Sequence, residues 1–221
     1  MASDRNNKGP HPLQDLYEVR LPMLGPSDIL DRTVIGLGAS TGGTEATQTL
    51  LHRLPADIPP MVIVQHMPDG YTAMYAERLA RHCAMQVREA RQGDRLTRGV
   101  VLIAPAGLHT TVVRIGGDCC IQLQKTASVS GHRPSADVLL RSISKNANGP
   151  MVGILLTGMG KDGAAGLLEI KKSGGYTLAQ DKATSVVYGM PRAAAELGAV
   201  CDQKSIYLLP DLLIGYLNSI K

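Results

Sequence analysis

The sequence of 221 residues contains no tryptophan and no phenylalanine, so tyrosine is its only large aromatic residue. Hydrophobic residues still make up 44% of the chain, and a core must therefore be built from Leu, Ile, Val, Ala and Met. Proteins that bind single-stranded nucleic acids without sequence preference stack the bases on aromatic side chains, which are scarce here. The formal net charge of +4 is small, and basic residues alternate with acidic ones. Both features argue against a nucleic-acid-binding protein.

Cysteines are few, and long apolar runs are absent. The four cysteines, Cys83, Cys119, Cys120 and Cys201, form no CxxC pair and have no spacing typical of a metal site. No stretch approaches the ~18 consecutive apolar residues of a membrane span. The N-terminal stretch MASDRNNKGPHPLQDLYEVR lacks the apolar segment of a signal peptide. We therefore expect a cytoplasmic protein with reduced thiols, no bound metal and no insertion into a membrane.

The pattern of the chain changes at about residue 32. Residues 1–31 are polar and contain several Pro and Gly residues, so we predict an N-terminal tail or linker there. Residues 32–221 are predicted to form one domain, in which short apolar runs alternate with longer amphipathic stretches. This alternation is typical of parallel strands joined by crossover helices. It predicts an α/β fold: a doubly wound, mostly parallel sheet with helices on both faces and a small β-hairpin at one edge.

The individual elements follow from the same pattern. Strands are predicted at 34–37, 61–65, 100–104, 151–157 and 176–179. Helices are predicted at 44–54, 71–83, 135–146, 163–173, 191–197 and 208–219. The hairpin is predicted from 109–115 and 120–124, which flank the turn residues GGD.

The stretch VIGLGASTGG, residues 34–43, predicts a strand, a glycine-rich turn and the start of a helix. A dinucleotide site needs the pattern G-x-G-x-x-G and an acidic residue near the end of the second strand. Here Thr41 stands at the third glycine, and the second predicted strand ends in Gln65 and His66. A later stretch, GILLTGMGKDG, has Met159 where a phosphate-binding loop needs lysine. We therefore predict that the protein binds no nucleotide cofactor.

Ser40 in the first turn is better explained as a nucleophile. Its small neighbours allow the chain to turn sharply, as a serine raised between a strand and a helix requires. A serine hydroxyl needs a base, and His66 follows the second predicted strand. Asp162 and Asp181 each follow a later strand, and the carboxyl ends of parallel strands lie at one edge of the sheet. Either aspartate could orient the histidine, and the residues alone favour Asp162 by a small margin.

The remaining histidines have no such placement. His132, in the stretch GHRPS, begins a possible helix-capping sequence and could border the cleft. The others are interpreted as surface or local structural residues: His11, His52, His82 and His109.

Seven stretches, in this order, resemble the catalytic domain of the chemotaxis protein-glutamate methylesterase (CheB) family. They extend over about residues 33–200 and read IGLGASTGGTEA, VIVQHMPDGYT, IAPAGLH, GHRPSADVL, ILLTGMGKDGAAGL, AQDKATSVVYGMP and ELGAV. The resemblance implies a Ser-His-Asp triad that hydrolyses glutamate methyl esters on the cytoplasmic helices of chemoreceptors. It assigns the triad to Ser40, His66 and Asp162, and so selects Asp162 over Asp181.

The resemblance has further implications. It implies methyl-accepting chemotaxis receptors as partners and deamidation of receptor glutamines as a second activity. Members usually carry a phosphorylatable receiver domain upstream, whereas about 31 residues precede the domain here, so regulation by phosphorylation stays open. The backbone N–H groups of Thr41 and Met159, in the turns beside the nucleophile, are our predicted oxyanion donors. The alternatives are a free-standing CheB-like esterase and a docking module that acts outside chemotaxis.

Overall fold

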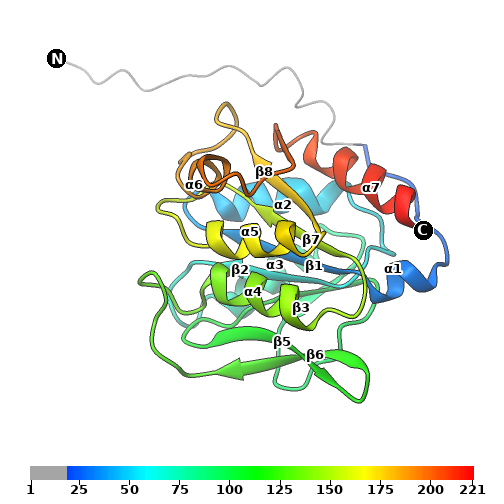
Figure 1. The fold of residues 1–221 in the computed structure, drawn as a ribbon, viewed down its shortest axis with the longest axis horizontal. Helices are drawn as coiled ribbons and strands as arrows, with labels where there is room; N and C mark the ends of the chain where they lie inside the picture. The colour runs from blue at the N-terminus through cyan, green and yellow to red at the C-terminus, as the bar shows by residue number, and fades with distance from the viewer. Residues whose placement is uncertain (1–18) are drawn as a thin grey trace.

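A seven-stranded sheet runs through the middle of the computed structural model, which describes residues 19–221 (Figure 1). Its strand order is β3-β4-β2-β1-β7-β8-β9, and every neighbouring pair is parallel. The strands are β1 (Val34–Ala39), β2 (Met61–Gln65), β3 (Gln86–Glu89), β4 (Val100–Ile103), β7 (Met151–Leu155), β8 (Tyr176–Gln180) and β9 (Asp202–Lys204). The predicted doubly wound, mostly parallel sheet is confirmed.

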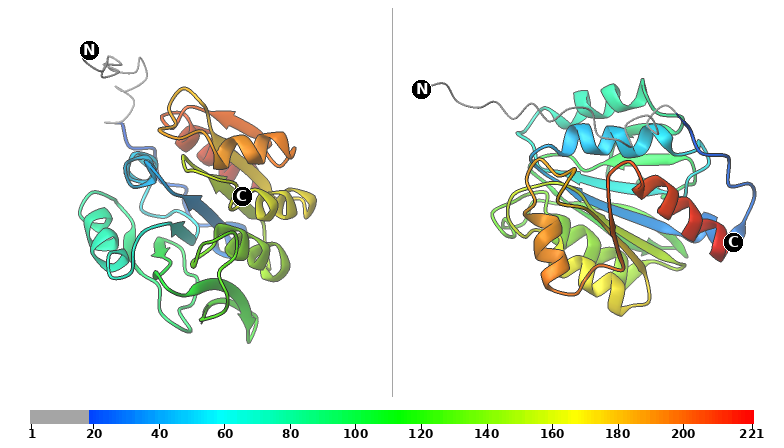
Figure 2. Two further views of the ribbon diagram at one scale, coloured as in Figure 1. Left: turned by 90° about the vertical axis from the view of Figure 1, so that its left-hand side faces the viewer. Right: turned by 90° about the horizontal axis from the view of Figure 1, so that it is seen from above.

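Helices cover both faces of this sheet. Figure 2 shows α2 (Gly43–Arg53) and α3 (Thr72–Ala80) on one side, and α4 (Ala136–Asn146), α5 (Ala164–Lys172) and α6 (Met190–Glu196) on the other. The C-terminal helix α7 (Leu209–Ile220) and the short α1 (Asp28–Arg32) share the core of α2 and α3. Every residue of β1 and β2 is buried, because both faces of a parallel sheet are covered. This explains why the central strands read as continuous apolar runs.

The predicted hairpin forms a two-stranded antiparallel sheet of its own. It consists of β5 (His109–Ile115) and β6 (Asp118–Gln124), joined by two glycines whose φ angles are +58° and +92°. A tight two-residue turn of this kind favours glycine because it needs positive φ. The hairpin packs on α4, where Ser142 Oγ accepts a hydrogen bond of 2.8 Å from Val112 N. The chain after β3 also hydrogen-bonds to β6, through Leu96 N and Cys119 O at 2.9 Å. The hairpin thus lies at one edge of the molecule, beyond α4.

Three elements were not predicted: β3, β9 and α1. The sequences of the two strands are QVRE and DQK, and only one of these seven residues is buried. Short polar strands at the edges of a sheet carry no alternation that a sequence pattern can detect. The other strands differ from the prediction by at most two residues at their ends, as with β7, which ends at Leu155.

Part of the predicted tail or linker, 1–31, lies outside the described residues, which begin at 19. The described part packs against the domain, where Leu24 and Leu30 are buried in the core. The carboxylate of Asp57 accepts hydrogen bonds from the backbone N–H groups of Leu24 and Gly25, at 3.0 and 2.8 Å. These contacts attach the segment to the side of the sheet that α2 and α7 cover.

The topology determines where polar loops gather. Strand β1 lies between β2 and β7 at the centre of the sheet. The chain first adds strands on the β2 side of β1 and later adds strands on the β7 side. In open α/β sheets a crevice forms at this switch point, at the carboxyl ends of the strands. The loops after β1, β2 and β7 therefore meet there, and these loops carry Ser40, His66 and Asp162.

Candidate active site

Ser40 follows the last residue of β1 and is held from both neighbouring strands. Its N–H donates to Thr157 O at 3.0 Å, in the chain that follows β7. Its carbonyl oxygen accepts from Gln65 Nε2 at 2.9 Å, at the end of β2, and from Gly43 N at 2.7 Å, at the start of α2. Gln65 Nε2 also donates to His66 O at 3.1 Å. One amide group thus connects the backbones of the candidate nucleophile and the candidate base.

Two glycines make room for this turn. Gly42 has a φ of +77°, and a Cβ added there would lie 2.6 Å from Val186 Cβ. A Cβ added at Gly158 would lie 2.7 Å from Ser40 Cβ. A larger residue at Gly158 would displace Ser40, and one at Gly42 would displace Val186 and strain the backbone at positive φ. The glycines around Ser40 therefore support a close approach of three loops.

His66 and Asp162 lie together beside Ser40. The backbone N–H of His66 donates to Ala39 O at 3.0 Å, which continues the pairing of β2 with β1. On its ring, Nε2 lies 2.9 Å from Asp162 Oδ2. The histidine side chain is 8% exposed and that of Asp162 1%. Since an ionised carboxylate only accepts hydrogen bonds, Nε2 carries the proton and Nδ1 is the basic nitrogen. This Nδ1 is buried and has no hydrogen-bond partner within residues 19–221.

Asp162 is surrounded by hydrogen-bond donors. Ser135 Oγ donates to Oδ1 at 2.7 Å, and the backbone N–H groups of Ala136 and Asp137 donate to Oδ2 and Oδ1 at 2.7 and 3.2 Å. Burial by itself raises the pKa of Asp162, but the bonds from His66, Ser135 and these N–H groups outweigh it. The net effect lowers the pKa of the carboxyl below its ordinary value. Asp162 is therefore ionised at neutral pH, and it binds the N-terminus of α4 as well as the imidazole.

Asp181, the alternative aspartate, has local partners. Its Oδ1 accepts from Thr184 N at 2.9 Å and from Thr184 Oγ1 at 2.6 Å. These bonds close a turn inside the loop that follows β8. The structure therefore places Asp162, and not Asp181, on the ring of His66.

The predicted oxyanion donors lie in the turns on either side of Ser40. Thr41 follows it directly, and its carbonyl oxygen accepts from Thr157 Oγ1 at 2.9 Å. Met159 follows Gly158, and the residue is 71% exposed. Val186, which lies over Gly42, is 69% exposed. Two large apolar side chains thus stand in solvent close to Ser40. The donor role of Thr41 and Met159 stays a prediction.

Three polar residues around the predicted Ser-His-Asp triad were missed or only partly anticipated: Gln65, His132 and Ser135. The ring of His132 stacks on that of His66, although the sequence indicated only that His132 could border the cleft. The signal for Ser135 was its position at the start of the predicted helix 135–146, since serine is a preferred N-cap residue, and the structure places it as the N-cap of α4. The role of Gln65 had no sequence signal, because it depends on the pairing of two strands. A cavity of about 290 Å³ opens beside the two stacked rings.

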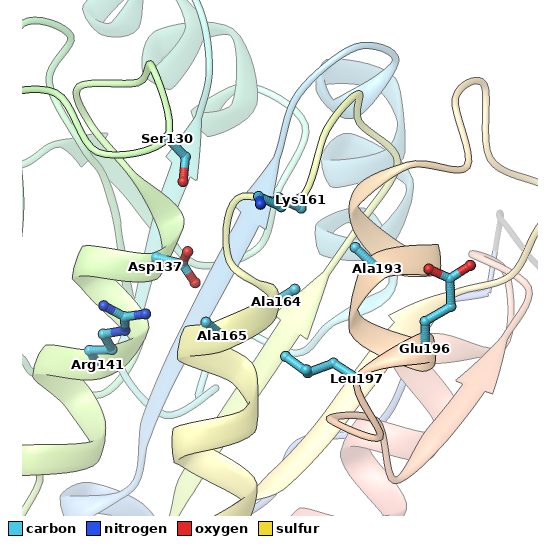
Figure 3. A pocket seen from close by; sticks show the side chains of 9 residues that line it. All are labelled: Ser130, Asp137, Arg141, Lys161, Ala164, Ala165, Ala193, Glu196 and Leu197. Carbon is cyan, nitrogen blue, oxygen red and sulfur yellow. The ribbon is translucent and has the colours of Figure 1, made fainter.

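A larger cavity lies on the other side of the β7–α5 loop. Its volume is about 540 Å³, and Figure 3 shows that its side chains come from α4, α5, α6 and the adjoining loops. Arg141 and Lys161 contribute positive charge, and Asp137 and Glu196 contribute negative charge. A neighbouring cavity of about 650 Å³ shares Lys161 and Glu196 with it and extends to Met159. The depression therefore reaches from Met159 to α6, and its lining carries charges of both signs.

Across residues 19–221, no three His, Cys, Asp or Glu side chains are grouped so as to hold a metal ion. Over the same part of the chain, none of the helices is both long and apolar enough to cross a membrane.

The fold and this edge together define the class of protein. It is a doubly wound α/β protein that gathers a serine, a histidine and an aspartate at the carboxyl ends of its parallel strands, the residue set of serine hydrolases. Residues 35–213 match the family described as CheB methylesterase. The chain belongs to this family, and the resemblance found in the sequence is confirmed.

Known relatives agree with this assignment. The chain is 54% identical over 169 residues to a protein of Pseudomonas aeruginosa named protein-glutamate methylesterase/protein-glutamine glutaminase 2, covering 76% of this chain and 48% of that protein. A Syntrophotalea carbinolica protein named protein-glutamate methylesterase/protein-glutamine glutaminase is 50% identical over 185 residues, or 84% of this chain and 52% of that protein. The chain thus spans about half the length of these curated relatives.

A solved structure is also similar. The crystal structure of the Thermotoga maritima CheB methylesterase catalytic domain aligns with a TM-score of 0.81 at 35% sequence identity. The alignment covers 83% of this chain and 97% of that one. The part of the chain that aligns therefore corresponds to nearly all of the Thermotoga maritima catalytic domain.

Proposed function

We propose that this chain hydrolyses the γ-methyl esters of glutamate side chains in a protein substrate, with Ser40 as nucleophile. The observation that carries the proposal is the Asp162–His66 hydrogen bond of 2.9 Å, next to Ser40 in the pairing of β1 with β2. The bond leaves Nδ1 of His66 without a hydrogen-bond partner among the described residues, so this nitrogen is available to take the proton of the Ser40 hydroxyl. The names of the relatives support glutamate methyl esters as the substrate class.

The reaction follows from these groups. Nδ1 of His66 takes the proton of Ser40 as Oγ attacks the γ-carbonyl carbon of the ester. The proton then passes to the departing methoxide, methanol leaves, and an acyl-enzyme remains. Nδ1 then takes a proton from water, which attacks the acyl carbon. The bond to Ser40 Oγ breaks, Oγ takes the proton back from the imidazolium, and the glutamate side chain leaves as its acid, which ionises in water. Asp162 keeps the proton on Nε2 and stabilises the imidazolium throughout.

The tetrahedral intermediates need donors for the oxyanion. We assign this role to the backbone N–H groups of Thr41 and Met159, because their turns flank Ser40. A primary amide passes through the same kind of intermediate, so the proposal extends to deamidation of glutamine, in agreement with the second half of the relatives' names. The exposed side chains of Met159 and Val186 would then contact the apolar part of the substrate surface.

The proposed substrate is the cytoplasmic part of a methyl-accepting chemotaxis receptor, which would place the reaction in the cytoplasm. We assign the catalytic unit to residues 32–221. A phosphorylatable receiver domain usually precedes this unit in the family, and we propose such a domain as its regulatory partner. The receptor as substrate and the receiver domain as regulator both rest on the family resemblance.

The test is release of methanol from a receptor fragment that carries methylated glutamates. We expect the chain to release methanol and the Ser40→Ala variant to lose at least about 10³-fold in turnover, because the nucleophile is gone. Ser144→Ala is a matched control, since Ser144 Oγ donates only to Arg141 O in the preceding turn of α4. Release by Ser40→Ala at the rate of the unmodified chain would disprove the assignment. Receptor binding without methanol release would point to a docking module.

A further inference from the structure

A second histidine lies flat against the candidate base. The ring of His132 stacks on that of His66 with centroids 3.7 Å apart and planes inclined by 8°. The two rings come from different parts of the chain, the loop after β2 and the turn before α4. His132 is not one of the groups that the proposed reaction uses.

The turn that carries His132 is tightly defined. His132 and Val129 exchange two backbone hydrogen bonds, of 2.9 and 3.0 Å. Between them, Ser130 and Gly131 have φ angles of +53° and +81°, as a type I′ turn requires at both central positions. Ser130 is the one non-glycine residue in the described part of the chain with a positive φ. The backbone therefore fixes the point from which the side chain of His132 extends toward His66.

We propose that His132 is a positioning residue that sets the plane of the His66 imidazole, so that Nδ1 stays where it can take the proton of Ser40. The hydrogen bond from Nε2 to Asp162 fixes one corner of the ring. The ring could still tilt about that bond, because a single hydrogen bond tolerates a range of angles. A second ring stacked on its face blocks the tilt. Since the inference concerns the base of the esterase reaction, it rests on the proposed function.

The charges around the pair agree with this role. Burial lowers the pKa of His132, the positive charge of protonated His66 lowers it further, and Asp162 acts in the opposite direction. Within its own turn Arg133 is adjacent, but its Nη1 donates to Thr126 O at 2.8 Å. His132 is therefore neutral at neutral pH. When His66 takes up the serine proton, only one of the two stacked rings is charged, and a neutral π face beside a cation is favourable.

The experiment measures covalent labelling of Ser40 by a fluorophosphonate probe in the full chain. Labelling requires a serine that is activated by its base, and it can be measured without a natural substrate. In His132→Ala we expect the rate constant at saturating probe to fall by about ten- to a hundredfold, because a misplaced base slows the step. The probe concentration at half-saturation should not change. His132→Phe keeps a flat ring and should retain a rate within about threefold of the original. His82→Ala, which removes an exposed histidine, is the control.

A second variant covers the case in which His132→Ala does not fold. His132→Leu fills most of the volume but has no flat face, and we expect it to be as slow as His132→Ala. Labelling of either variant at the original rate would overturn the inference, and so would a His132→Phe variant as slow as His132→Leu. If the unmodified chain is not labelled at Ser40, the proposed function fails and the inference falls with it. Labelling of the unmodified chain and of all His132 variants at the same rate would reject the role of His132 and leave the proposed function in place.

Discussion

The loops after β7 and β8 each place an aspartate close behind a parallel strand, at the same edge of the sheet. Asp162 in the first loop is 1% exposed and accepts hydrogen bonds from His66 and from the first residues of α4. Asp181 in the second loop is partly buried, and its side chain closes a turn with Thr184. The same residue type thus connects distant segments in one loop and stabilises only its own turn in the other. The hydrogen-bond partners around each carboxylate therefore distinguish the two aspartates, whereas their positions after a strand do not.

Neutralising each carboxylate in turn should give the largest difference between the two aspartates. Asp162→Asn should lower turnover by about 10³–10⁴-fold, because an amide no longer fixes the tautomer of His66 or stabilises its charged form. Asp181→Asn should stay within about threefold, since its partner is local. Methanol release from a methylated receptor fragment measures both. A large loss in Asp181→Asn together with a small loss in Asp162→Asn would reverse the assignment.

A finer test removes one hydroxyl donor from each aspartate. Ser135→Ala takes away the donor to Asp162 Oδ1 and the cap of α4, so we expect a loss of about tenfold in turnover and about 1–2 kcal/mol in stability. Thr184→Val removes the corresponding donor to Asp181 and should cost about 1 kcal/mol in stability. Its turnover should remain within about twofold of the original. Urea unfolding and turnover are measured on the same samples. Equal losses of turnover in the two variants would contradict the different roles given to Asp162 and Asp181.

The smallest expected effect is in the pH dependence of stability. Hydrogen bonds lower the pKa of Asp162 below its ordinary value of 3.8, despite the opposing effect of burial. A lowered folded-state pKa means that the carboxylate stabilises the folded chain above pH 3.8 and that this is lost as the pH falls through the lowered pKa. As the pH falls below about 5, the free energy of unfolding should therefore decrease more in the unmodified chain than in Asp162→Asn. Urea unfolding across this range measures the difference, and parallel curves would contradict it.

Much of the fold was predictable from local patterns. The central strands β1, β2 and β7 are buried on both faces and read as apolar runs, and the helices between them show the spacing of one buried side. The edge strands β3 and β9 could not be found in this way, because their residues are mostly polar and partly exposed. The segment before residue 32 looked like a linker because it is polar on average, although Leu24 and Leu30 pack into the core.

For the candidate site, the sequence determined which residues the topology could bring together. A parallel strand precedes each of Ser40, His66 and Asp162. Their side-chain chemistry, as nucleophile, base and carboxylate, and the family resemblance together identified them as candidates. The residues alone favoured Asp162 over Asp181 only by a small margin, because both follow a parallel strand at the same edge of the sheet. The chemistry of the residues could not show that the imidazole of His66 contacts Asp162 or that His132 stacks on its face, and the tertiary structure shows both contacts. The physical reason is that periodicity and turn chemistry act over a few residues. Contacts between loops, in contrast, depend on strand register and on the packing of α4 against the sheet.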